Sequence, residues 1–240
     1  MGTANIGVIN TQRFEFGYVN QWTNPYETNG LVAMWDGEWN ASRGIHDETI
    51  VDEWVDIING MKFTSLRGSC SFSNTNRAIL KGCVLSGLFG QLASVFSSKT
   101  FTIQYIIPSC SDSRGYVLWR FPPYDINPGI EIWRNNKRFN FSDASRAVFS
   151  TAGDMSCQTL TVNETIFSLY SASNKQSLTR TYTAPVFNPN SGLALLGSDQ
   201  STSTYYFTGE VCSLRFYDRV LSDEEIYASH AIDKARFNLP

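Results

Sequence analysis

The fold is decided by residues 207–237, which read FTGEVCSLRFYDRVLSDEEIYASHAIDKARF. In the first half of this stretch Cys212, Leu214 and Phe216 alternate with Ser213 and other neighbours of different character. Alternation with a period of two is typical of a strand that buries one face. The pattern then changes at a turn, so we expect a strand followed by an element of another kind.

The second half of the stretch carries the start signals of a helix. Ser222 is a favourable N-cap, and Glu225 stands three residues later, where it completes a capping box. Leu221 and Ile226 flank the cap as a hydrophobic staple. We expect a helix from Asp223 to about Arg236 that lies against a sheet. Its expected apolar side consists of Ile226, Ala231, Ile232 and Ala235.

Composition limits the class of protein. The 240 residues include 42% hydrophobic and 14% aromatic residues, enough for a substantial core, and length alone permits one large domain or two small ones. The net charge is −3, and the 19 Lys and Arg are scattered, which argues against a nucleic-acid-binding surface. No run of eighteen apolar residues predicts a membrane span, and the first residues lack the pattern of a secretion signal.

The five cysteines favour buried thiols over a disulfide framework. Their number is odd, and none forms a CxxC pair of the kind that binds zinc. Most of them stand in apolar or serine-rich, strand-like surroundings, as expected for a chain made in a reducing cytoplasm. These residues are Cys70, Cys83, Cys110, Cys157 and Cys212.

Strand signals cover most of the chain. Short segments rich in β-branched and aromatic residues are bounded by Gly, Pro, Asn or Ser, the spacing of an all-β sandwich or barrel. Residues 134–142 indicate a hairpin that turns at Asn135 and Asn136, whereas residues 86–96 fit either a short helix or a loop. The expected strands are 31–37, 62–66, 77–82, 101–107, 115–121, 129–135, 158–163, 165–171, 177–183 and 193–198.

The strand expected at 101–107 shows its two faces most clearly. Phe101, Ile103, Tyr105 and Ile107 share one face, and Thr102 and its second neighbour Gln104 share the other.

Three stretches together resemble a known family. GLVAMWDGEWNASRGIHDETIVDEWVDIING at 30–60, FTIQYIIP in mid-chain and the closing FTGEVCSLRFYDRVLSDEEIYAS are similar to a laminin-G-like, concanavalin A-like lectin-glucanase domain. Such domains occur in phage virion and bacterial surface proteins. The resemblance covers about residues 30–237 and implies a jelly-roll β-sandwich whose first and last strands pair, with a short C-terminal helix beside them. We therefore divide the chain into an N-terminal arm or extra strand, 1–29, and one jelly-roll domain, 30–240.

The carboxylates do not form the pattern of a glycosidase. A retaining enzyme needs two carboxylates about 5 Å apart, but no expected strand offers such a pair, and Glu131 and Glu210 each stand alone. His46 and His230 have no recognisable nucleophile beside them. We expect no enzyme activity, and a carbohydrate-active enzyme is the third hypothesis.

A sugar-binding role has more candidate residues. Exposed aromatic rings stack on pyranoses while polar side chains bind the hydroxyls. The candidate binding residues are Trp39, Tyr124, Asp125, Trp22 and Tyr205, and Tyr26 is a further aromatic expected in a loop. For Trp39 and Tyr124 a core position is as good an interpretation, while Trp35, Trp54, Trp119 and Trp133 are expected in the core.

The resemblance implies calcium as a possible cofactor, because many laminin-G-like domains bind it on the rim. Several oxygen ligands must converge on such an ion. The available carboxylates are Asp36, Asp47, Asp112 and Asp199, in loop-like surroundings without DxDxDG spacing. The alternative is that these residues cap turns.

The sequence-based hypothesis is a non-enzymatic glycan-binding or adhesion component of a phage virion, released into the extracellular space by lysis. Its expected partners are a surface polysaccharide and neighbouring virion subunits, contacted through the arm. A homo-oligomer is one possible assembly. The alternative is a purely structural virion or connector protein without a sugar site.

Overall fold

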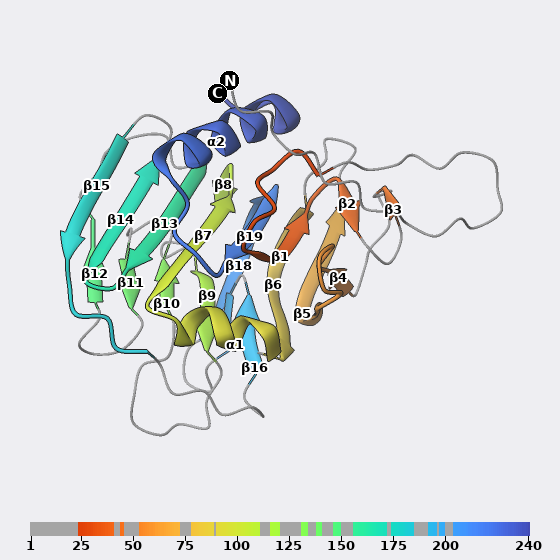
Figure 1. Cartoon of the computed structure of the whole chain (residues 1–240). Helices are drawn as coiled ribbons and strands as arrows, with labels where there is room; N and C mark the ends of the chain where they lie inside the picture. The colour runs from red at the N-terminus through yellow and green to blue at the C-terminus, as the bar shows by residue number, and fades with distance from the viewer. Residues whose placement is uncertain are drawn as a thin grey trace.

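A computed structural model describes residues 24–40, 44–45, 53–72, 78–88, 90–110, 116–120, 131–133, 138–140, 146–149, 156–171, 174–184, 192–195, 197–199 and 204–240. Within these ranges antiparallel strands form two large sheets, one behind the other, and two helices accompany them (Figure 1). None of the helices in these ranges is long and apolar enough to cross a membrane.

The first large sheet has six strands, and its order differs from the order of the chain. The final strand lies between the first strand and a strand from mid-chain. In spatial order the strands are β1 (Leu31–Asp36), β19 (Ser213–Tyr217), β7 (Thr100–Ile106), β13 (Cys157–Asn163), β14 (Ile166–Ser171) and β15 (Asn174–Thr179).

The second large sheet has eleven strands and contains two long ones that pair with each other. A main path of eight strands runs through it, and three further strands attach to this path. The path is β12 (Arg146–Val148), β11 (Arg138–Asn140), β10 (Glu131–Trp133), β9 (Tyr116–Arg120), β16 (Gly192–Leu195), β6 (Ala78–Leu88), β18 (Thr204–Val211) and β17 (Gly197–Asp199). The attached strands are β5 (Lys62–Phe72) on β6, β4 (Glu53–Val55) on β5, and β8 (Ser109–Cys110) on β18.

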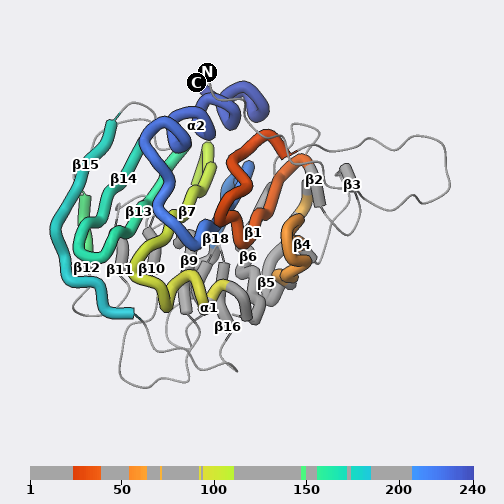
Figure 2. The backbone as a smooth tube through the Cα atoms, viewed as in Figure 1, coloured from red at the N-terminus to blue at the C-terminus, as the bar shows by residue number. Residues whose placement is uncertain are grey.

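The remaining elements lie around the two sheets. A short hairpin joins β2 (Trp39–Asn40) to β3 (Gly44–Ile45). Helix α1 (Gly90–Ser97) lies at one end of the sandwich, and helix α2 (Asp223–Phe237) lies at the other end, where the blue end of the tube crosses the first sheet (Figure 2).

The core fills the space between the sheets. Phe101 and Leu160 from the first sheet and Phe63 and Phe207 from the second belong to one buried apolar cluster. Trp35 lies within it, 4.6 Å from Phe63 between ring centroids. Such a two-sided core is what holds a β-sandwich together.

Helix α1 covers one end of the core. Leu92, Val95 and Phe96 are all buried in the core cluster, and their i, i+3, i+4 spacing gives the helix one apolar face. The segment that the sequence left open between helix and loop is thus a helix over Gly90–Ser97.

The main sequence-based expectations for the fold are confirmed. The structure is an all-β sandwich with a C-terminal helix, and β1 pairs with β19 from Leu31 opposite Tyr217 to Asp36 opposite Ser213. The predicted hairpin exists as β10 paired with β11, although its turn lies outside the described residues. The predicted inward face of β7 is confirmed, since alternate residues from Phe101 lie in the core cluster.

The division of the chain at residue 29 stays a prediction. Residues 24–29 run alongside α2, and Tyr26 is 4% exposed beneath the helix. Leu31 then begins β1, after Gly30 at a φ of +77° that glycine adopts without strain.

Candidate functional site

Helix α2 begins as the sequence predicts. The Ser222 side chain accepts a hydrogen bond from the Glu225 backbone N–H, and the Glu225 carboxylate accepts one from the Ser222 N–H. Arg219 donates from both Nη atoms to the same carboxylate, at 2.9 and 2.8 Å, and from Nε to the Asn29 carbonyl. This Arg219 guanidinium lowers the pKa of Glu225 below its usual range. Glu225 therefore connects the helix start to the segment before β1.

The inner side of α2 is more polar than the sequence predicts. Its buried residues are Ile226, Ser229, His230, Asp233 and Phe237. The predicted apolar side is wrong in part, since Ala231 and Ala235 are exposed. The physical reason is that the sheet beneath the helix presents polar groups, and a buried polar group requires a polar partner.

Those polar groups come from the outer face of β19 and β7. Arg215 is fully buried and donates to both oxygens of Asp233, at 2.8 and 2.5 Å, where Asp233 is also fully buried. Gln104 accepts a third hydrogen bond from Arg215 Nε at 2.8 Å. The expectation that β19 buries one face only is therefore wrong, because α2 covers the second face.

Tyr26 covers this ion pair on the side of the N-terminal segment. The Arg215 guanidinium carbon lies 3.8 Å from the centre of the Tyr26 ring, within the range of a cation–π contact. The Tyr26 hydroxyl donates to Asp233 Oδ1 at 2.5 Å and accepts from Arg236 Nη1 at 2.8 Å. Burial, and next the charge of Asp233, raise the pKa of Tyr26, so the hydroxyl stays protonated.

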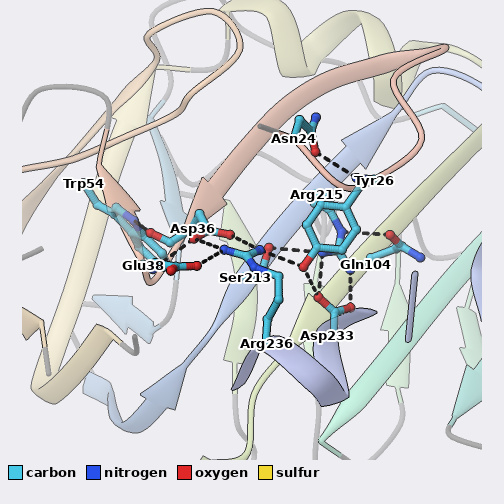
Figure 3. A network of polar contacts seen from close by, with 10 residues as sticks. All are labelled: Asn24, Tyr26, Asp36, Glu38, Trp54, Gln104, Ser213, Arg215, Asp233 and Arg236. Atoms are coloured by element: carbon cyan, nitrogen blue, oxygen red, sulfur yellow. Dashed lines mark hydrogen bonds and ion pairs between the residues drawn. The ribbon is translucent and has the colours of Figure 1, made fainter. Parts of the chain in front are cut away.

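Arg236 extends the network to the end of β1 (Figure 3). It binds both oxygens of the buried Asp36, at 2.9 and 3.0 Å, and Glu38 Oε2 at 2.6 Å. Burial raises the pKa of Asp36, and the Arg236 guanidinium opposes that rise. Three segments that are far apart in sequence, residues 24–26, the end of β1 and α2, are therefore joined by one buried network.

A groove lies beside this network, between residues 24–29 and α2. Its volume is about 390 Å³. The helix side is formed by Glu225, Ala228, Ser229 and Ile232, and the other side by residues 24–29. The described residues supply both walls of this groove.

A third buried carboxylate, Asp56, shapes the loop after β4. Asp56 accepts four backbone hydrogen bonds, from Met34, Ile58, Asn59 and Met61, at 2.8 to 3.1 Å. Burial raises the pKa of Asp56, and these four N–H groups oppose the rise. All four donors are backbone groups, which gives Asp56 a structural role in this loop.

Comparison with known proteins identifies the family. Residues 94–227, more than half of the chain, match the family model of the concanavalin A-like lectin/glucanases superfamily. The chain belongs to this superfamily. A search of curated protein sequences finds no match.

Solved structures with the same fold include proteins of different sizes. A Trypanosoma rangeli sialidase in complex with 2,3-difluoro-KDN is 16% identical with a TM-score of 0.52, over 86% of this chain and 34% of that one. The binding domain of botulinum neurotoxin DC, in complex with SialylT, is 11% identical with a TM-score of 0.56, over 86% and 52%. Domain 4 of an extracellular arabinanase from Geobacillus stearothermophilus, in complex with arabinotriose, is 14% identical with a TM-score of 0.53, over 84% and 98%.

These similarities show the fold alone, because every identity is low. The chain spans about a third of the length of the sialidases, so the sialidase reaction is not transferred to it. By contrast, the match to the arabinanase domain covers 98% of that domain and 84% of this chain.

The predicted sugar-binding residues are spread over several elements. The backbone of Trp39 is in β2, opposite Ile45. Tyr205 is in β18, opposite Ser198 and one residue along from the pair of Asp199 and Thr204. The side chains of Trp39, Tyr205 and Asp199, and the whole of Trp22, Asp47, Asp112, Tyr124 and Asp125, lie outside what the structure describes.

The calcium prediction stays untested for most of its residues. Asp36 is the last residue of β1, not a loop residue, and both its oxygens bind Arg236. In the described part of the chain, no group of three or more His, Cys, Asp or Glu side chains is placed to hold a metal.

The buried network of Arg215, Asp233 and Arg236 was not predicted from the sequence. One signal was available, since an arginine in the middle of the strand SLRFY requires an anionic partner once both faces are covered. The partner itself lies 18 residues away on α2, beyond the reach of any local pattern.

Proposed function

We propose that this chain is a glycan-binding module. The observation that carries the proposal is its membership of the concanavalin A-like lectin/glucanases superfamily. Two proteins with this fold and TM-scores above 0.5 were solved in complex with SialylT and with arabinotriose. Recognition without catalysis fits a fold that presents loops and grooves on a rigid sandwich.

The described carboxylates favour binding over hydrolysis. A glycosidase acid must reach the substrate from a cleft, with a second carboxylate close to it. Asp36, Asp56 and Asp233 are each 0% exposed and already bound to arginines or backbone N–H groups. Glu225 is bound to Arg219 and to the helix start. A carbohydrate-active enzyme, the third hypothesis, would need an acid pair that includes carboxylates other than these four.

The proposed stacking residues are those of the sequence prediction. Trp39 stands in the β2–β3 hairpin, a short projection beside the sandwich (Figure 1). Tyr205 and Asp199 stand on the neighbouring strands β18 and β17, where Tyr205 pairs with Ser198 and Asp199 pairs with Thr204. Successive residues of a strand alternate between the two faces of a sheet, so we propose the ring of Tyr205 and the carboxylate of Asp199 as separate contacts.

The test is an array of bacterial and mucin glycans probed with the purified chain, once with calcium and once with a chelator. Specific signal is the expected result, and loss of signal on chelation would assign calcium a part in it. Trp39→Ala should weaken array binding, whereas Tyr227→Ala, which removes an exposed aromatic from α2, should leave it unchanged. A blank array in both conditions would refute the proposal and favour a purely structural role.

The proposed setting is a phage virion, with release by lysis and neighbouring subunits as partners. Buried Cys157 and Cys212, packed with Ile106 and Phe237 in a small apolar cluster, support folding in a reducing compartment. Light scattering after size-exclusion chromatography tests the assembly: a stable closed oligomer is the expected result, and a monomer at all concentrations would count against a virion part.

A further inference from the structure

The groove between residues 24–29 and α2 has the size of a ligand site. Its volume is about 390 Å³, within the range of roughly 300–1,000 Å³ that small-molecule sites occupy. The α2 wall contains the apolar residues Ala228 and Ile232, and the opposite wall contains Pro25. The same groove contains the polar residues Glu27 and Asn29. Mixed walls of this kind match a sugar ring, which has an apolar C–H face and a polar hydroxyl edge.

Asn24 supplies an unused hydrogen-bond donor at this groove. It is 2% exposed, and its Oδ1 accepts the Tyr26 backbone N–H at 3.0 Å. Its Nδ2 is buried and has no hydrogen-bond partner. Figure 3 shows the amide with its oxygen toward Tyr26 and its nitrogen on the opposite side. Nδ2 lies below the accessible surface, so a sugar oxygen accepts from it only after the Asn24 amide turns toward the groove. A buried donor without an acceptor is costly, which favours that turn when an oxygen atom is present.

The charges around the groove favour a neutral ligand over an anionic one. Glu27 and Glu225 line it, with side chains 35% and 28% exposed. Arg219, whose Nη2 lies 3.7 Å from Glu27 Oε1, already donates to Glu225, to the Asn29 carbonyl and to the Val220 carbonyl. Carboxylates accept hydrogen bonds from hydroxyls but repel another carboxylate.

The groove is also held in a fixed shape. Tyr26 anchors residues 24–29 to Asp233 and Arg236, and Arg219 joins Asn29 to Glu225 at the helix start. Both walls are therefore tied to the buried network, which lowers the conformational cost of binding.

We propose that this groove is a binding site for an uncharged sugar residue, with Asn24 donating to a ring or hydroxyl oxygen and Glu27 accepting from hydroxyls. The proposal rests on the glycan-binding function proposed above and names its site and ligand class. It separates this site from the predicted aromatics Trp39 and Tyr205, which lie on other elements.

The closing experiment fills the groove with a side chain. Ala228 and Ala231 are both exposed on α2, but only Ala228 lines the groove. Both variants, Ala228→Trp and Ala231→Trp, should fold, which circular dichroism and thermal denaturation verify. Each is then probed with an array of neutral oligosaccharides and their sialylated counterparts, beside the wild-type chain.

The expected result is that the wild-type chain binds each neutral oligosaccharide more tightly than its sialylated counterpart. Ala228→Trp should lose at least about tenfold in affinity while Ala231→Trp matches wild type. Asn24→Asp, which keeps the acceptor for Tyr26 and removes the donor, should weaken binding likewise.

Equal binding by the two tryptophan variants would overturn the groove site and leave the glycan-binding function standing. A preference for sialylated glycans would overturn the assigned ligand class. No binding by wild type would refute the function and the site together.

Discussion

The buried pair of Arg215 and Asp233 gives the sharpest prediction about stability. The change Asp233→Asn keeps the size of the side chain but removes the charge that compensates a fully buried guanidinium. Breaking a buried ion pair by removing one partner costs about 3–5 kcal/mol, because the other charge is left uncompensated. Weakening the hydrogen bond from the Tyr26 hydroxyl to Asp233 adds about 1 kcal/mol.

The expected loss in the free energy of unfolding is therefore about 4–6 kcal/mol. For a chain of this size it corresponds to a fall in Tm of roughly 10–20 °C. Urea denaturation followed by tryptophan fluorescence measures the first quantity, and differential scanning calorimetry measures the second. A total stability of about 5–15 kcal/mol is typical of domains, so the variant would lose a large part of it.

A matched control lies on the same helix. Asp223 pairs with Lys175 at 2.8 Å, but the two side chains are 48% and 38% exposed, so Asp223→Asn should cost less than about 1 kcal/mol. Adding Arg215→Met to Asp233→Asn removes the uncompensated charge and should restore part of the loss. If Asp233→Asn and Asp223→Asn prove equally mild, the claim that α2 is held by a desolvated ion pair is refuted.

Three further predictions concern single residues elsewhere. Asp56→Asn should destabilise the fold by about 3 kcal/mol in urea denaturation, because an amide nitrogen cannot accept from the backbone N–H groups that the carboxylate now binds; a loss below about 1 kcal/mol would contradict this role. Gly209→Ala should prevent folding or lower Tm steeply, because the new Cβ would lie 2.2 Å from the backbone oxygen of Ser109. In the control, Gly60→Ala, the Cβ meets open space and the cost is only the strain of a φ of +70°. Equal Tm losses for the two variants would refute the steric argument. The lowered pKa of Glu225 means that its stabilising contribution is complete above the unfolded value near 4.5 and is lost as pH falls through the lower folded value; Glu225→Gln should therefore flatten the acid limb of helix content measured by circular dichroism, and an unchanged limb would count against it.

The start of α2 was predictable from sequence because capping is local. Ser222 and Glu225 are three residues apart, and the box they form satisfies backbone groups of the same turn. The two faces of β7 were predictable for a similar reason, since alternation along one strand records which side meets the core.

The inner face of α2 was not predictable in this way. Assigning the Ala and Ile side chains to the buried side takes no account of the side chains on the sheet beneath the helix. Because the buried Arg215 needs an anionic partner, the inner face of α2 contains the carboxylate of Asp233. Tyr26 joins the same network from 207 residues away. A pattern read over a few turns contains no information about partners at that distance.

The candidate site could not be predicted from sequence for the same reason, because its walls are distant in the chain. Asn24, Glu27 and Ala228 form one groove only because residues 24–29 cross α2, a contact set by the buried network. The sequence offered loop aromatics instead, because exposed rings are the recognisable sign of sugar binding.

The position of β19 also governs the order in which the protein can fold during synthesis. β19 hydrogen-bonds to β1 on one side and to β7 on the other, yet it leaves the ribosome after all the other described strands of the sandwich. Until then the nascent β1 has no partner in its sheet, and β7 has one open edge. Such edges are templates for pairing with other chains, so fragments ending before residue 213 should be prone to aggregation. The sandwich is completed only after translation has passed β19, and α2 then covers the strand that completed it.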